Sequence, residues 1–149
     1  MKAICDAWLI QIDITNACIH KCSHCTRGVP HVRKPFFMDL ELVERALKSL
    51  EGWKYGVGCM GGEPTLHPQF PEICELYKKY VPKKRRGILT TGGKKYEQYK
   101  DLINETFGYI NFNDHYATGY HQPLMVASEE IVKDEDFRRK LIDNCWLQR

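Results

Sequence analysis

The feature that most constrains the fold is a fourfold alternation of apolar and amphipathic segments along the chain. Each apolar segment has the length of a strand, and each is followed by a loop rich in glycine, cysteine or asparagine. This alternation is typical of a parallel α/β sheet, in which a helix carries the chain back between neighbouring strands. The expected strands are 8–15, 55–60, 87–91 and 109–113.

Apolar residues at helical spacing predict a helix after each of these loops. Asp39 is the expected N-cap of the first helix, which ends at Gly52, and Pro82 stops the second. A last helix, expected from about Asp134, carries Phe137, Leu141 and Cys145. The expected helices are 40–52, 70–81, 96–107 and the region from about 134 onward.

Length and composition limit the class of protein. The 149 residues fit one domain, 1–149, and 43% hydrophobic with 28% charged residues exclude a disordered or fibrous chain. The net charge of +3 is far below that of a dedicated nucleic-acid-binding protein. No segment reaches the roughly 18 apolar residues of a membrane span, and Asp6, Gln11 and Asp13 interrupt the N-terminal stretch. We therefore expect a cytoplasmic protein without a membrane partner.

Three of the seven cysteines form the strongest local motif. Cys18, Cys22 and Cys25 have the spacing C-x-x-x-C-x-x-C directly after the first strand. An odd number of cysteines with three in one short loop points to metal chemistry in a reducing compartment. One loop of this spacing can hold three corners of a 4Fe–4S cluster. The fourth iron then keeps an open coordination site, which a catalytic cluster needs.

A second motif follows the second strand. Gly61, Gly62, Glu63 and Pro64 occupy the loop one βα unit after the cysteines. With both motifs, the sequence resembles the radical S-adenosylmethionine (radical SAM) superfamily from about Trp8 to His115. The resemblance implies that Cys18, Cys22 and Cys25 hold the 4Fe–4S cluster. The further residues that it implies for binding S-adenosylmethionine are His24 beside the adenine, Gly61, Gly62 and Glu63 at the methionine amino group, and Asn113 near the ribose and carboxylate.

The same resemblance places Thr90, Thr91 and Gly92 at the exit of the third strand, and Asn111 and His115 around the end of the fourth. All of these segments follow strands, and ligands of parallel α/β folds bind at the carboxyl ends of strands. The implied activity is reductive cleavage of S-adenosylmethionine to a 5′-deoxyadenosyl radical, which abstracts hydrogen from a substrate. The electron would come from a flavodoxin or ferredoxin.

Two alternatives to this enzyme stay open. One is a binding module without catalysis, stabilised by a cluster or by zinc held by the three cysteines with His20 or His24. Such a module could bind RNA through the basic residues 78–79 and 83–86. The other is a degenerate family member that binds a cluster but cannot cleave the cofactor. Cys59, Cys74, Cys5 and Cys145 are interpreted as packing residues.

The number of strands leads to an expectation about completeness. The family core has about six βα units in a partial (β/α) barrel, whereas about four parallel units can be read here. We therefore expect a truncated core in which the fourth strand is an open edge. A continuation beyond Arg149 is the favoured explanation. Self-association at that edge and folding back of residues 117–131 are the alternatives.

Overall fold

The strands form one five-stranded sheet in the consecutive order β1-β2-β3-β4-β5. The computed structural model describes residues 7–22, 25–113, 124–127, 129–136 and 139. The first four strands are parallel, and β5 is antiparallel to β4. Each predicted strand is present within one residue of its expected bounds. The strands are β1 Leu9–Thr15, β2 Gly56–Gly61, β3 Arg86–Thr90, β4 Tyr109–Phe112 and β5 Leu124–Ala127.

The first two helices follow the predicted pattern, the third is divided, and α5, Glu129–Lys133, begins before the expected start of the last helix. The Asp39 carboxylate accepts a hydrogen bond from the Leu42 N–H at 2.8 Å, which confirms the predicted N-cap. The segment expected as one helix over 96–107 is two helices that meet at Tyr99, where the backbone leaves helical geometry and the ring packs on Phe70. The α-helices are α1 Leu40–Ser49, α2 Phe70–Tyr80, α3 Lys94–Gln98, α4 Lys100–Thr106 and α5 Glu129–Lys133; the 3-10 turns are η2 Val29–His31, η3 Pro64–Leu66 and η4 Lys83–Arg85.

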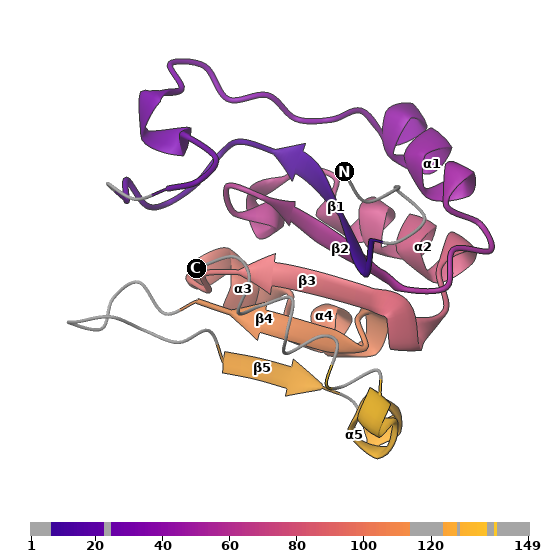
Figure 1. The fold of residues 1–149 in the computed structure, drawn as a ribbon. Coiled ribbons are helices and arrows are strands. Elements are labelled where there is room, and N and C mark those ends of the chain that lie inside the picture. The colour runs from indigo at the N-terminus through magenta and orange to yellow at the C-terminus, as the bar shows by residue number, and fades with distance from the viewer. Residues whose placement is uncertain (1–6, 23–24, 114–123, 128, 137–138, 140–149) are drawn as a thin grey trace.

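One face of the sheet packs against the helices. Figure 1 shows α2, α3 and α4 behind the strands. A consecutive parallel order joined by right-handed crossovers places the crossover helices on the same side, as in a barrel. Cys59 and Cys74 are fully buried in this core, so their predicted packing role is confirmed. The strand residues of the core are Ile12, Ile14, Val57, Cys59, Ile88 and Ile110. The fold is thus α/β with the architecture of a partial (β/α) barrel.

The Tyr109 side chain covers the amino ends of β2 and β3 on the face of the sheet opposite the helices. A Cβ added at Gly87 would lie 2.2 Å from the Tyr109 ring, and one at Gly56 would lie 2.6 Å from its hydroxyl oxygen. The ring therefore lies across two neighbouring strands where side chains are absent. It is 2% exposed. This packing leaves the carboxyl ends as the open end of the sheet.

The expectation that the fourth strand is an open edge is wrong. β5 pairs with β4 along its whole length, from Tyr109 opposite Ala127 to Phe112 opposite Leu124. Because β5 lies within 117–131, folding back of that segment is the alternative that the structure adopts for this edge. The edge strand beside β4 is therefore β5. Phe137, Leu141 and Cys145 of the expected last helix lie outside the described residues.

Across the parts of the chain that the structure describes, no helix is both long and apolar enough to cross a membrane.

Candidate cluster and cofactor site

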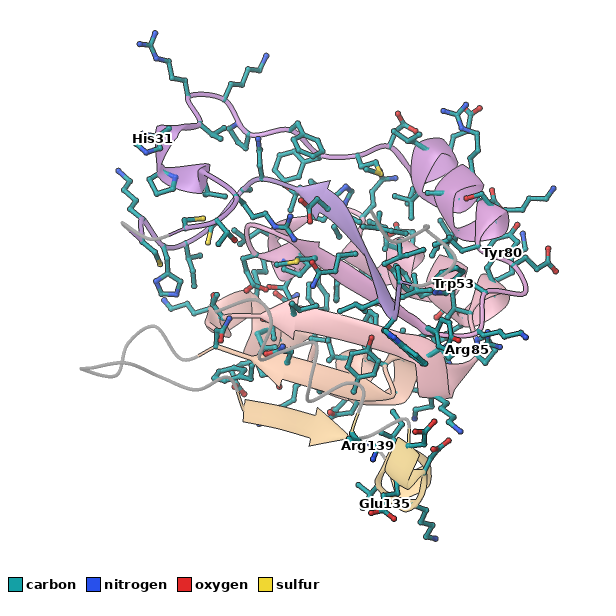
Figure 2. All side chains as sticks on the ribbon, viewed as in Figure 1. His31, Trp53, Tyr80, Arg85, Glu135 and Arg139 are labelled. Atoms are coloured by element: carbon teal, nitrogen blue, oxygen red, sulfur yellow. The ribbon has the colours of Figure 1, made fainter. Side chains whose placement is uncertain are left out.

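The four loops that carry the sequence motifs lie at one end of the sheet. In Figure 1 the arrowheads of β1 to β4 point to the same side, and the cysteine loop that follows β1 extends from it. His31 marks this loop in Figure 2, whereas Arg85 lies at the opposite end of the strands. The basic residues 83–86 are therefore remote from the motif loops. Lys84 also forms an ion pair with Asp134.

Hydrogen bonds close the cysteine loop at its base. The Thr15 hydroxyl donates to the Phe36 carbonyl at 2.7 Å, and the Phe36 N–H donates to the Asn16 side-chain oxygen at 2.7 Å. The Met38 N–H donates to the Ile14 carbonyl at 2.8 Å. Residues 17–35 are thus a loop whose two ends are held together at the end of β1.

Cys18, Cys22 and Cys25 all carry free thiols that are partly exposed. Burial raises the pKa of the Cys18 thiol, the His20 N–H that donates to its sulfur opposes this, and the charges of Glu63, Cys22 and Cys25 raise it further. Cys18 therefore lies within electrostatic range of both other thiols and of Glu63. Ligation to iron requires the thiolate form, which a nearby metal stabilises.

The side chains of the described residues do not converge on one metal ion: no group of three or more histidine, cysteine, aspartate or glutamate side chains among them has that arrangement. Zinc needs its ligands at about 2.0–2.3 Å from a single centre. An iron–sulfur cluster instead distributes its thiolates over separate irons. The three free thiols on this loop are of the ligand type that an iron–sulfur cluster takes. His24 lies outside the described residues.

The bend after β2 packs backbone to backbone against the cysteine loop. The Gly62 N–H donates to the Thr15 carbonyl at 2.9 Å, and the Glu63 N–H donates to the Ala17 carbonyl at 2.7 Å. A Cβ added at Gly62 would lie 2.2 Å from the Ala17 oxygen and 2.9 Å from the Cys18 Cβ. Glycine is thus required here because the cysteine loop itself approaches, in addition to any approach of a ligand.

Glu63 is 1% exposed, and its carboxylate lies among three threonines. Oε1 accepts from the Thr65 hydroxyl at 2.7 Å and the Thr65 N–H at 3.2 Å. Oε2 accepts from the Thr91 N–H at 2.7 Å and the Thr91 hydroxyl at 3.1 Å. The Thr90 hydroxyl lies 2.9 and 3.0 Å from the two oxygens. A carboxylate has about four acceptor sites, so these five donors fill it, and a further donor would have to replace a hydroxyl.

The residues that follow β3 and β4 complete the candidate site at the carboxyl ends of the strands. A Cβ at Gly93 would lie 2.8 Å from the Ile19 side chain of the cysteine loop. The Asn113 N–H donates to the Thr90 carbonyl at 2.9 Å. The structure thus brings the cysteine loop, the Gly61–Glu63 bend and the exit of β3 into contact, with the end of β4 beside them. The predicted residue His115 lies outside the described residues, whereas Asn111 is buried on β4.

The sequence analysis did not predict the polar side chains on the inner face of the sheet, which is the face opposite the helices. Arg27 of the cysteine loop donates to the Gln11 side-chain oxygen at 2.8 Å and lies 3.5 Å from the Asp13 carboxylate. Its Nη2 also lies 2.9 Å from the Met60 sulfur. Gln11 and Asp13 alternate with Ile12 and Ile14 along β1. This period of two was the signal that could have identified them.

His67 was also missed, and it holds the loop after the bend. The Gln69 N–H donates to its Nδ1 at 3.1 Å, so the neutral ring carries its hydrogen on Nε2, which lies 2.9 Å from the Met38 carbonyl. Met38 follows the base of the cysteine loop, so His67 links that loop to the segment after Glu63. The ring is 2% exposed.

We expect His67 to make folding stability depend on pH. Burial lowers its pKa below the ordinary value of 6.5, although the Met38 carbonyl and the Glu72 charge oppose the shift. The unfolded chain therefore binds the proton more readily, and the contribution to stability is full above pH 6.5 and is lost as the pH falls through the lowered pKa. Thermal melts from about pH 7.5 to about pH 5 should show a smaller loss of melting temperature for His67→Gln than for the parent chain. An equal loss in both chains would contradict this role.

The parallel strands with helices on one face, and motif loops gathered at the carboxyl ends, define an α/β barrel-type protein with a thiol-rich site. The sequence model of the Radical SAM superfamily matches residues 12–132. The chain therefore belongs to the radical SAM superfamily. A comparison with curated proteins gives no match.

Proposed function

We propose that this chain is a radical SAM enzyme that holds a 4Fe–4S cluster on Cys18, Cys22 and Cys25. The observation that carries the proposal is the contact of the two motifs, because Gly62 packs directly against the residues at the start of the cysteine loop. Family membership supports the same cofactors. Three thiolates from one loop would leave one iron without a protein ligand.

The Gly61–Glu63 bend would hold the methionine part of S-adenosylmethionine beside that iron. A reduced cluster bound there would supply one electron to the sulfonium of S-adenosylmethionine, so that the C5′–S bond would break to give methionine and a 5′-deoxyadenosyl radical. The Gly62 N–H fixes the bend to the end of β1, and the Glu63 N–H fixes it to the cysteine loop. Such fixed spacing would orient the cofactor relative to the thiols. His24 and Asn113 would contribute further contacts to the cofactor.

The proposed cluster chemistry also implies partners and a location. Thiolate ligands and a reduced cluster require a reducing compartment, so we place the protein in the cytoplasm. Its electron would come from a flavodoxin or ferredoxin. The inner face of the sheet below the motif loops, where Arg27 and Asp13 lie, is the region in which we expect the substrate to bind.

Cleavage of S-adenosylmethionine tests this function. With dithionite and no oxygen, the cluster-loaded chain should convert S-adenosylmethionine to 5′-deoxyadenosine and methionine, measured by chromatography. Glu63→Ala should keep its iron but lose about 1.5–3 kcal/mol of cofactor binding, the contribution of a charge-assisted hydrogen bond. Glu51→Ala, at an exposed carboxylate after α1, is the control. If Glu63→Ala binds and cleaves the cofactor like the parent chain, Glu63 has another role.

A further inference from the structure

The Glu63 carboxylate carries a charge that its surroundings do not neutralise. Its five hydrogen-bond donors are three hydroxyls and two backbone N–H groups, all of them neutral. Within the described parts of the chain, no lysine, arginine or histidine forms an ion pair with it. Both oxygens accept from a backbone N–H, which can only donate. This is the hydrogen-bonding pattern of an ionised carboxylate.

The charge is also fixed in position and shielded from solvent. Thr65 lies in η3, Thr90 ends β3 and Thr91 follows it, so two separate segments of the chain hold the carboxylate. With Glu63 at 1% exposure, water and salt screen its charge weakly. An exposed glutamate of the same charge would have little effect at a distance of several ångströms.

This charge lies beside the cysteine loop. The Glu63 N–H is bonded to the Ala17 carbonyl at 2.7 Å, and the neighbouring Gly62 lies against the Cys18 Cβ. The buried carboxylate of Glu63 is therefore held close to the start of the cysteine loop, where its negative charge opposes the addition of further negative charge.

We propose that Glu63 lowers the reduction potential of a cluster held by Cys18, Cys22 and Cys25, with Thr65, Thr90 and Thr91 as the positioning residues that hold its charge in place. The inference rests on the proposed function, because it requires the cluster. Reduction adds one electron to the oxidised cluster and breaks no bond. A buried negative charge nearby makes that addition less favourable. Cleavage of a sulfonium needs a strongly reducing electron, which such a charge helps to provide.

The test is a redox titration with dithionite, followed by electron paramagnetic resonance, on cluster-loaded protein without S-adenosylmethionine. Leaving the cofactor out separates the effect of the charge from any role as a ligand. Glu63→Gln removes the charge and should shift the midpoint potential to a more positive value. Glu51→Gln, which removes an exposed charge outside the site, is the control and should stay close to the parent potential.

Glu63→Gln could fail to fold, because the NH2 group of the introduced glutamine would face backbone N–H donors. A second variant therefore repeats the test. Glu63→Leu combined with Thr90→Val and Thr91→Val removes the carboxylate together with two of its hydroxyl donors, and it should show the same positive shift. An unchanged midpoint potential in a cluster-loaded variant overturns the inference about the potential but leaves the proposed function intact. Loss of the cluster from both variants but not from the parent also overturns it, since Glu63 then serves to hold the loop. A parent chain that binds no cluster overturns the proposed function as well.

Discussion

Cys22→Ala is expected to remove most of the iron that the chain binds. After anaerobic reconstitution the parent should hold about four irons and four sulfides, with the broad visible absorption of a 4Fe–4S cluster. Cys22 lies in the middle of the motif, on a loop whose ends are held together at the end of β1. A cluster that has only three protein thiolates has no spare ligand, so the loss of one should leave it unstable to handling.

Cys59→Ala is the matched control for that measurement. Cys59 is also near the end of a strand, but it is fully buried in the core against the helices. Burial raises the pKa of its thiol well above the ordinary value, which disfavours the thiolate that a metal needs. Its replacement should cost about 1 kcal/mol of folding stability through a small cavity and leave the iron content unchanged. Stoichiometric zinc in protein purified without oxygen, with no iron after reconstitution, would show that the parent site is not a cluster site.

The sequence was sufficient for the four parallel strands because their buried side chains come from apolar runs with clear turn signals at both ends. The meeting of the motif loops was also predictable, since parallel strands end on the same side of a sheet. β5 was not predicted as a strand. Leu124–Ala127 is only four residues long, too short for its apolar pattern to distinguish a strand from a helix, and its place is set by pairing with β4.

Two details of the site depend on three-dimensional contacts that no local pattern contains. Thr90 and Thr91 could be placed at the exit of β3, but their contact with Glu63 requires β2 and β3 to lie side by side in the observed register. The break at Tyr99 likewise depends on a neighbour, because its ring packs on Phe70 of α2. In both cases the sequence pattern identified the residue, but the side chain that it contacts was evident only from the three-dimensional structure.

The single substitution Gly62→Ala is expected both to lower the folding stability of the chain and to impair cluster binding. An added Cβ would lie 2.2 Å from the Ala17 oxygen and 2.7 Å from its carbonyl carbon, both backbone atoms that cannot rotate away. The bend and the cysteine loop must then separate. The separation strains or breaks the bond from the Glu63 N–H to the Ala17 carbonyl, 2.7 Å long in the parent. Steric strain and a lost buried hydrogen bond together should cost about 2–4 kcal/mol.

The matched control for Gly62→Ala is Gly58→Ala, in the same strand region but away from the cysteine loop. A Cβ at Gly58 would lie 3.3 Å from a methyl carbon of Leu89, a flexible side chain that can yield. The smaller backbone entropy of the unfolded chain with alanine offsets this contact, so its stability should stay within about 1 kcal/mol of the parent. Thermal melts of the metal-free chains, followed by iron analysis after reconstitution, compare the two. In a chain of this size about 2–4 kcal/mol corresponds to a fall of roughly 5–15 °C in Tm. If Gly62→Ala has the same Tm as Gly58→Ala and holds as much iron as the parent chain, the two motifs do not depend on this backbone contact.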